Sequence, residues 1–339
     1  MRVANWNIEW MNDWFVPIRE GGPDWRDGPV TGGRPVEDVR ELADRVAAVI
    51  RRMAPDLLAV QEGPSRAGEM QLFVDEHLDG AFKVLGPTGR GTQRLYILAR
   101  TDGAISSVER LWPEPGEIDF DLAWPVDVVG DLVIEPYDFT RTPLVAVVRA
   151  GGRRYVVVNL HTKSKYIHRG RALWVNEATR PQFIAQAVRN RRRIAAELMR
   201  IRSWIEDRLD ADPEERLIVL GDLNDGPGVD FFEENYLINN VVTAVAGSPF
   251  TPHKMLRHAF IDRERRERNW TARFDDFVDG VADRPLLLDH ILLSPALNWG
   301  AFRNARIEHE AFEEQLRADL PGRASRPSDH RPQTADFEI

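Results

Sequence analysis

Several apolar runs of this sequence end in short clusters of polar side chains. The run "LIVLGDLND" (217–225) shows the pattern, because four apolar residues lead through a glycine into Asp222 and Asn224. A strand that only had to turn would not need so many oxygen-bearing side chains. Comparable positions at the ends of other apolar runs, or inside them, hold Asn5, Asn7, Glu9, Gln61, Glu62, Asn159, His161, Lys163, Lys165, Asp289, His290, Asp329 and His330.

These residue types together suit the hydrolysis of a phosphate ester. Carboxylate and amide oxygens, in a chain without cysteine, favour a hard cation such as Mg²⁺ or Mn²⁺. Histidine, asparagine, lysine and arginine can donate hydrogen bonds to phosphoryl oxygens. A histidine with a carboxylate partner forms a general-base pair. The set therefore predicts metal-assisted attack of water on a phosphate ester.

Each of these residues also has an ordinary structural explanation. An Asp-x-Asn sequence after a strand is common in turns, because these side chains cap turns. A lone histidine in an apolar run, such as His290, is commonly a core residue, and we expect it in the core. The combination favours a site, because strand ends are a common place for the active sites of α/β proteins.

The elements that must position these residues form an α/β pattern. Apolar residues recur at helical spacing over 39–53 and over 184–205, where the basic segment "RNRRR" (189–193) interrupts them. Near-continuous apolar runs are typical of strands that are covered on both faces. Such runs predict strands at 57–62, 94–100, 143–150, 154–162, 216–224 and 286–294.

No linker divides the chain, so we expect a single α/β domain over 1–339. Two segments, 112–138 and 247–283, are long for connecting loops and are predicted to be insertions. Their aromatic residues either pack the insertions onto the domain or stack on nucleic-acid bases. The aromatic residues in question are Trp112, Trp124, Trp270 and Phe274.

Composition bounds the class of protein. A hydrophobic content of 43% and a charged content of 29% over 339 residues indicate a soluble globular protein. The lack of cysteine excludes disulfide bonds and thiolate chemistry. No apolar run reaches the ~18 residues that a membrane-spanning helix needs, and the first residues lack the apolar core of a signal peptide. We therefore expect a cytoplasmic protein without a membrane segment.

Charge is distributed unevenly along the chain. The net charge of −9 argues against a purely electrostatic nucleic-acid binder. Residues 161–208, however, hold twelve Lys or Arg against four Asp or Glu, so a local basic surface is available for a phosphate-bearing ligand. The "RNRRR" segment is either part of that surface or a solvated helix face.

Six motifs resemble, in their order along the chain, those of the endonuclease/exonuclease/phosphatase superfamily, and in particular its bacterial nuclease-like members. They are "WNIEW", "LLAVQEG", "VVNLHTKSK", "LGDLND", "LLDHILLS" and "SDHRP", and they extend from residue 6 to residue 332. The resemblance implies the deoxyribonuclease-I-like fold, a four-layer α/β sandwich of two mixed β-sheets flanked by helices. It also implies dependence on Mg²⁺ or Mn²⁺.

The resemblance implies a role for each matching residue. Glu62, Asn7, Glu9 and Asp329 match metal-binding or metal-proximal positions. His330 matches the general base, and Asp289 the carboxylate that orients it. Asp222 and Asn224 match the pair that positions the attacking water and the phosphate, and His161 matches a ligand of the scissile phosphate. Asn159, Lys163, Lys165 and Arg141 are the expected substrate-binding residues.

The substrate is less well determined by the sequence. Nucleic acid is the expected substrate, with a small phosphate ester (a nucleotide, a sugar phosphate or a lipid headgroup) as the alternative. The chain lacks the Cys-Asp-Arg pattern of inositol polyphosphate 5-phosphatases, which counts against that branch. A closed pocket made by 112–138 and 247–283 would favour a small ester. The sequence indicates no protein partner.

Overall fold

Two six-stranded β-sheets pack face to face in the computed structural model, which describes residues 1–339 except 17–21, 27–35, 37, 90, 238–239, 261–267 and 299. The first sheet has the order β15-β16-β1-β2-β4-β3. Its strands are β1 (Arg2–Asn7), β2 (Leu57–Gly63), β3 (Phe82–Leu85), β4 (Arg94–Arg100), β15 (Phe302–Ile307) and β16 (Gln333–Phe337).

The second sheet has the order β11-β14-β10-β9-β8-β5. Two short hairpins lie outside the sheets: β6 (Trp124–Val126) with β7 (Glu135–Tyr137), and β12 (Ala272–Asp276) with β13 (Val281–Leu286). The strands of the second sheet are β5 (Ile105–Arg110), β8 (Leu144–Ala150), β9 (Arg153–His161), β10 (Leu217–Asp222), β11 (Arg257–His258) and β14 (Asp289–Leu293).

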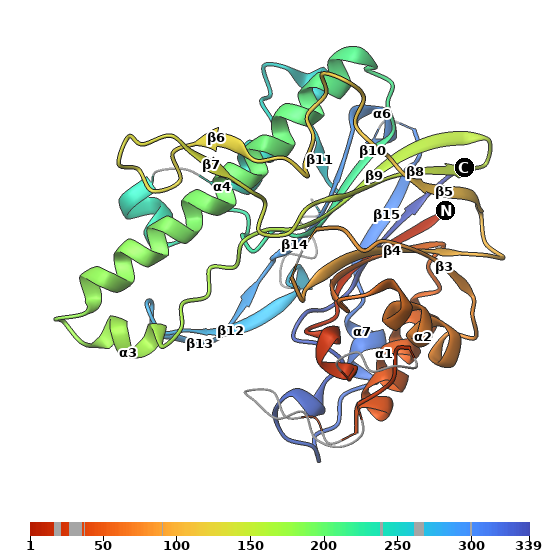
Figure 1. Ribbon diagram of the computed structural model, residues 1–339, viewed down its shortest axis with the longest axis horizontal. Coiled ribbons are helices and arrows are strands. Elements are labelled where there is room, and N and C mark those ends of the chain that lie inside the picture. Colours follow the sequence, from red (N-terminus) through yellow and green to blue (C-terminus); the bar gives the residue numbers. More distant parts are fainter. Residues whose placement is uncertain are drawn as a thin grey trace.

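Helices cover the outer face of each sheet, which completes four layers (Figure 1). The helices are α1 (Val39–Met53), α2 (Ala67–His77), α3 (Gly170–Val175), α4 (Arg180–Ala211), α5 (Val241–Ala246), α6 (Pro295–Asn298) and α7 (His309–Glu313). Shorter turns are the 3-10 segments η1 (Met11–Trp14), η3 (Pro252–Lys254) and η5 (Gly322–Ser325), and the π-helical η2 (Glu233–Leu237).

Side chains that alternate between the two faces of each strand form three hydrophobic cores. In β2, Leu57 and Ala59 face the second sheet, whereas Leu58 and Val60 face α1 and α2. On the far side, apolar residues of β9 and β10 pack against Ile194 and Ile201 of α4. Strands buried on both faces must be apolar throughout, which explains the near-continuous runs in the sequence. The predicted fold class, a four-layer α/β sandwich of two mixed β-sheets flanked by helices, is confirmed.

Most predicted elements are confirmed within a few residues. The runs at 57–62, 94–100, 143–150 and 154–162 are β2, β4, β8 and β9, and the run at 216–224 ends earlier, as β10. Helix α1 matches 39–53, and Asp38 caps it by accepting a hydrogen bond of 2.9 Å from the backbone of Glu41. Helix α4 is longer than predicted.

The predicted strand 286–294 was wrong at its start. Leu286 ends β13, and β14 begins only at Asp289. The backbone between them bonds elsewhere: the Leu288 carbonyl accepts from the Leu223 amide at 2.9 Å, and its amide donates to Thr271 Oγ1 at 3.1 Å. This break separates the small hairpin from the sandwich.

The two predicted insertions differ in kind. Residues 112–138 carry the β6–β7 hairpin and pack on α4 through Phe120, whose ring lies 5.6 Å from that of Trp204. Residues 247–283 belong partly to the sandwich, because β11 pairs with β14 at the sheet edge. Part of the second segment, 261–267, lies outside the described residues. Within the described chain, no helix is both long and apolar enough to cross a bilayer.

Candidate active site

Strand register brings three predicted site residues into one row. On the second sheet, Asp222 of β10 pairs with His161 of β9 on one side and with Asp289 of β14 on the other. Gly221 makes this row possible: its φ is +143°, and a Cβ there would lie 2.0 Å from the carbonyl oxygen of Leu160. The row is buried, with Asp222 and Asp289 each 1% exposed.

The first sheet adds its own polar strand ends to this row. Asn7, at the end of β1, donates a hydrogen bond of 2.9 Å from Nδ2 to Asp222 Oδ2 and one of 3.3 Å to Glu62 Oε1. His161 Nε2 lies 3.5 Å from Asp222 Oδ2 and 3.9 Å from Glu62 Oε1. The two sheets therefore meet in a single polar cluster, formed by residues far apart in the sequence.

His330 enters the cluster from the segment before β16. Its Nδ1 lies 2.7 Å from Asp289 Oδ2, and its Nε2 lies 3.9 Å from Asp222 Oδ2. A carboxylate beside Nδ1 favours the tautomer with the proton on that nitrogen, which leaves Nε2 free to accept one. Ser328 fixes the backbone, because its Oγ donates to the Asn7 carbonyl at 2.7 Å and accepts from the His330 amide at 3.0 Å.

Burial and neighbouring charges shift the pKa values in the cluster. Burial raises the pKa of Asp222 to about 7. The pKa of His330 is raised, since attraction to Asp289 and Asp222 outweighs the opposing effect of burial. Burial lowers the pKa of His161, and the nearby Arg141 lowers it further, so this imidazole is neutral at pH 7. The carboxylates of Asp289 and Asp222 thus favour the protonated form of His330, whereas burial favours the neutral form of His161.

The cluster offers ligands for a divalent cation, because Asp222, Asp289 and His330 each present one ligand atom within 4.8 Å of the others. Burial raises the pKa of Glu62, and the like charge of Asp329 raises it further. The donors are carboxylate and amide oxygens, which are the ligands that Mg²⁺ and Mn²⁺ prefer. Asp329 Oδ1 also lies 4.0 Å from His330 Nε2, which places this carboxylate beside the His330–Asp289 pair. A cation held by Glu62, Asn7 and Asp329, as the sequence predicts, would offset the repulsion between the carboxylates of Glu62 and Asp329.

Asn224 and Arg141, two further predicted residues, both donate to the Thr162 carbonyl beside the cluster. The side chain of Asn224 donates from Nδ2 to the Thr162 carbonyl at 3.2 Å. The backbone amide of Asn224 donates to Asp222 Oδ1 at 2.8 Å. Arg141 donates to the same carbonyl at 3.0 Å and also bonds Gln93 Oε1. The attraction of Glu62 and Asp222 opposes the burial that lowers the pKa of Arg141. Arg141 thus lies in the field of the site carboxylates.

Three predicted residues have other partners. Asn159 is fully buried, and its Nδ2 donates to the Val60 and Tyr96 carbonyls at 3.0 and 2.9 Å. Glu9 Oε2 lies 3.1 Å from the guanidinium of Arg323. The expected roles of Asn159 toward substrate and of Glu9 toward metal stay predictions. In the structure, Asn159 is a buried amide of the core and Glu9 forms a buried ion pair.

Lys165 is the third, and it lies in a second charged cluster. Its Nζ is 2.5 Å from Asp225 Oδ1, 2.8 Å from Asp230 Oδ2 and 3.0 Å from Glu233 Oε1. Carboxylate oxygens of these three acids lie within 4.8 Å of one another, which is close enough for a cation. Lys165 and Arg191 already form ion pairs with these carboxylates, so we do not assign a metal to the second cluster.

His290 confirms the expectation of a core histidine. It is 0% exposed, its Nε2 lies 2.7 Å from the Asp225 carbonyl oxygen, and its Nδ1 lies 2.7 Å from His258 Nε2.

Sequence reasoning missed Glu197, Thr271 and Ser328, which position the site without chemistry of their own. Thr271 Oγ1 accepts from the Asp289 amide at 3.2 Å. Glu197, on α4, binds the backbone of Lys163 at 3.0 Å and that of Thr140 at 3.0 Å. Glu197 could have been recognised in the sequence as a lone acid in a basic helix segment. Ser328 could have been recognised because it lies inside the "SDHRP" motif.

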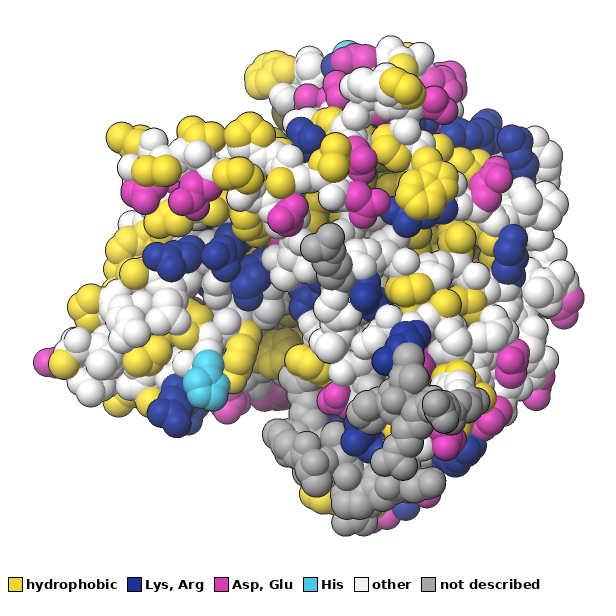
Figure 2. Space-filling model, viewed as in Figure 1, with side chains coloured by type: hydrophobic (Ala, Val, Ile, Leu, Met, Phe, Trp, Pro, Cys, Tyr) yellow, Lys and Arg dark blue, Asp and Glu magenta, His cyan; other side chains and the backbone are white. Residues whose placement is uncertain are grey.

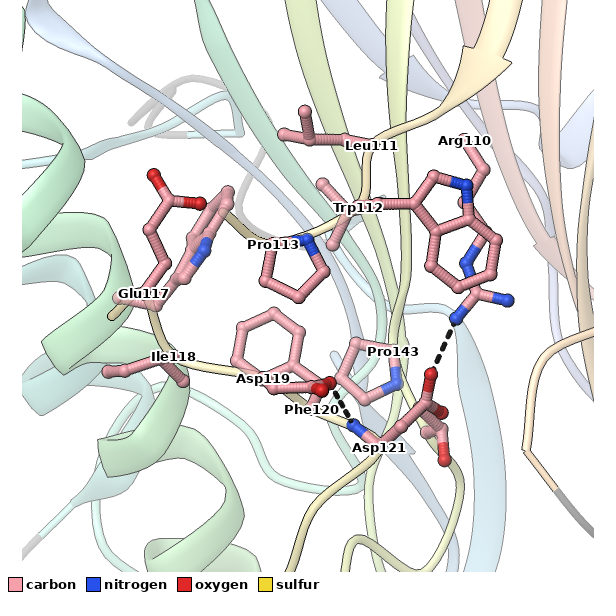
Figure 3. A pocket seen from close by; sticks show the side chains of 13 residues that line it. Arg110, Leu111, Trp112, Pro113, Glu117, Ile118, Asp119, Phe120, Asp121 and Pro143 are labelled. Carbon is pink, nitrogen blue, oxygen red and sulfur yellow. Dashed lines mark hydrogen bonds and ion pairs between the residues drawn. The ribbon is translucent and has the colours of Figure 1, made fainter. Parts of the chain in front are cut away.

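The hollow at residues 110–121 lacks the features of a catalytic site. Phe120 and Trp204 close it, and Arg110, stacked on Trp112, forms an ion pair of 2.8 Å with Asp121 (Figure 3). Its lining includes no residue of 247–283. The described residues thus give no pocket here that both predicted insertions enclose.

Comparison with known proteins rests on structure alone. No protein-family model matches the sequence, and no curated protein matches it either. Truncated TDP2 from Caenorhabditis elegans aligns with a TM-score of 0.52 over 100% of this chain and 97% of that chain, at 14% identity. The chain has the deoxyribonuclease-I-like fold.

Other proteins of the deoxyribonuclease-I-like fold align over similar lengths. A mannosyl-6-phosphatase of Bacteroides thetaiotaomicron has a TM-score of 0.50 at 11% identity and covers 100% of both chains. An endonuclease/exonuclease/phosphatase protein of Bacteroides vulgatus has a TM-score of 0.47 at 15% identity and covers 100% of this chain and 98% of that chain. The resemblance seen in the six sequence motifs is confirmed at the level of the fold.

Proposed function

We propose that this protein is a metal-dependent phosphoesterase, and that its substrate is a phosphodiester of nucleic acid. The observation that carries the proposal is the His330–Asp289 pair, which faces Asp222 across 3.9 Å in a buried cluster. A solvated turn would need no such buried arrangement. The fold supports the proposal, because one protein that shares it is named a mannosyl-6-phosphatase.

His330 is the proposed general base. Asp289 holds the imidazole with Nδ1 protonated, so that Nε2 accepts a proton from water. Asp222, Asn224 and His161 would orient the water and the phosphoryl oxygens, and Arg141 would bind the phosphate beside them. Mg²⁺ or Mn²⁺ held by Glu62, Asn7 and Asp329 would supply the positive charge that neutralises the phosphoryl oxygens and keeps the nearby imidazole unprotonated.

A phosphatase of a small molecule is the alternative, because the phosphatase that shares the fold is named for a sugar phosphate. Preference for nucleic acid is based on the basic stretch 161–208, which begins at a site strand and continues along α4. The two substrates require the same catalytic cluster, so only turnover separates them.

A cleavage assay tests the proposal. Plasmid DNA, single-stranded DNA, RNA and bis(p-nitrophenyl) phosphate are incubated with Mg²⁺ or Mn²⁺, with and without chelator. We expect polynucleotide cleavage that chelator abolishes and that His330→Ala lowers by about 10²–10⁴-fold. His168→Ala, which removes an exposed imidazole, is the control. Hydrolysis of the small ester alone would favour the alternative, and full activity of His330→Ala would reject the mechanism.

A further inference from the structure

We infer that Lys163 and Arg193 form a second anion subsite beside the catalytic cluster, which binds a further phosphate group of the substrate. The inference rests on the proposed function, because the first phosphate is the one to be hydrolysed. It specifies the substrate class: a phosphodiester or phosphomonoester that carries another phosphate close to the scissile bond.

Glu197 gathers the parts of this subsite. Its carboxylate accepts hydrogen bonds from the Lys163 amide at 3.0 Å, from the Thr140 amide at 3.0 Å and from the Tyr137 hydroxyl at 2.9 Å. Arg193 lies one turn earlier on the same face of α4. Arg141 directly follows Thr140. Glu197 therefore fixes the backbone of Lys163 and of Thr140, the residue before Arg141, while its oxygens bind neutral donors rather than the bases themselves.

These three bases have no ion-pair partner in the part of the chain that the structure describes. Among the described residues, no carboxylate lies within 4.0 Å of the charged nitrogens of Arg141, Lys163 or Arg193. The side chain of Lys163 donates only to the Ser164 carbonyl, at 3.1 Å, and the Nε of Arg193 is buried without a hydrogen-bond partner. Partly buried cations of this kind are costly unless a ligand neutralises them.

Neighbours in the same segments show the contrast. Lys165 lies two residues after Lys163, and Arg191 two residues before Arg193, yet both are neutralised by Asp230, at 2.8 Å and 2.6 Å. The "RNRRR" segment is therefore neither a uniform solvated face nor a uniform basic patch. Arg191 belongs to an internal network and Arg193 to the subsite, whereas Arg189 is exposed and Arg192 donates to the Val129 carbonyl.

The subsite continues the electrostatic row of the active site. Burial lowers the pKa of Lys163, and repulsion from Arg141 and Arg193 lowers it further. The pKa of His161 is lowered mainly by burial, and then by the positive charges of Arg141, His330 and Lys163. Lys and Arg side chains also gather across the middle of one face of the molecule, alongside α4 (Figure 2). A substrate with one phosphate at the cluster and a second beside Lys163 and Arg193 would therefore meet positive charge at both.

Chromogenic esters test the subsite directly. The substrates are the p-nitrophenyl esters of thymidine 5′-phosphate and thymidine 3′-phosphate, each without a second group, with a phosphomonoester on the other hydroxyl, or with a phosphodiester to a second thymidine there. We expect the second phosphate to raise kcat/KM about tenfold in at least one isomer, as suits a charge-assisted hydrogen bond. The monoester and diester arms separate a terminal phosphate from a polynucleotide backbone.

Variants locate the effect. Lys163→Gln and Arg193→Gln should each remove most of that gain. The control Arg153→Gln carries the same charge change at the opposite end of β9, on an exposed residue, and should retain the gain. No gain with any ester, or the same gain in all proteins, would overturn the inference. Circular dichroism and thermal unfolding confirm that each variant is folded.

Binding keeps this test separate from the proposed function. If the wild type hydrolyses none of these esters, calorimetric titration with inorganic pyrophosphate and orthophosphate decides the subsite. The phosphoesterase proposal fails only if the polynucleotides of the cleavage assay are also left intact. We expect pyrophosphate to bind about tenfold more tightly than orthophosphate, and the difference to disappear in Arg193→Gln but not in Arg153→Gln. Equal affinities in the wild type would overturn the subsite as well.

Discussion

At the scale of single residues, the chemistry of His330 depends on which partner each ring nitrogen meets. Asp289 occupies the Nδ1 side at 2.7 Å, and Asp222 lies on the Nε2 side at 3.9 Å. A second His–Asp contact with the same 2.7 Å separation joins His77 of α2 to Asp44 of α1, on the helical layer that covers the first sheet. Position next to Asp222, rather than the pair itself, gives His330 its proposed role.

Asp289→Asn should therefore lower kcat by about 10²–10⁴-fold. An amide can donate to Nδ1, which would move the ring proton to Nε2 and remove the base. Steady-state kinetics with the best substrate would measure the loss. Asp44→Asn makes the same change in the other pair and should leave kcat intact. A wild-type rate for Asp289→Asn would contradict the orienting role.

Glu62→Gln should weaken the binding of Mg²⁺ by about tenfold or more, since a charged oxygen ligand is replaced by a neutral amide. The measurement is the rise in thermal unfolding temperature during a Mg²⁺ titration, which does not depend on turnover. Glu109→Gln, on the exposed face of β5, is the matched control. If both variants titrate like the wild type, Glu62 is not a ligand.

At the scale of elements, ion pairs fasten the segment after β10 to helix α4. Asp230 Oδ2 accepts from Arg191 Nη2 at 2.6 Å and from Lys165 Nζ at 2.8 Å. Burial opposes the ionised form of Asp230, but Arg191 and then Lys165 outweigh it and lower the pKa of Asp230. The loop that begins at Asn224 is thereby held close to the helix that carries Arg193.

Asp230→Asn should lower the free energy of unfolding at pH 7 by about 2 kcal/mol, allowing for partial exposure of the pair. The folded-state pKa lies below the unfolded value of about 3.9, so this stabilisation is complete above that pH and is lost as pH falls through the folded pKa. Urea unfolding of both proteins at neutral and acidic pH measures the difference. A gap that stays constant down to low pH would contradict the ion-pair origin.

At the scale of the whole molecule, a net charge of −9 surrounds a local row of bases. The molecule as a whole repels polyanions, so any binding of nucleic acid must come from a few close contacts. Arg141, Lys163 and Arg193 provide three such contacts in the proposal. Attraction of this kind is short in range and sensitive to salt.

Binding of a short single-stranded DNA should weaken with salt, with a slope of log K against log salt of about −2 for three phosphate contacts. Fluorescence anisotropy across a salt series measures this slope. Arg193→Gln should make the slope shallower by about 0.7, whereas Arg153→Gln should not change it. A slope near zero would exclude a phosphate-binding row.

The sequence by itself determined the strands, the α/β class and the types of residue at the strand ends, because burial on both faces and turn chemistry are local constraints. It placed β2, β4, β8 and β9 closely, and it indicated Glu62, Asp222, Asp289 and His330 through motifs. It erred where backbone partners come from distant segments, as at the start of β14.

Tertiary structure alone decided which charges are free and which are paired. Lys163 and Lys165 are equivalent in a sequence reading, as are Arg191 and Arg193, yet packing of α4 against the segment after β10 neutralises one member of each pair. Pair formation depends on distances between segments that register and helix packing set together. The sequence therefore identifies the basic residues. Only the folded chain shows that Lys165 and Arg191 belong to the internal network, which leaves Lys163 and Arg193 for the proposed ligand.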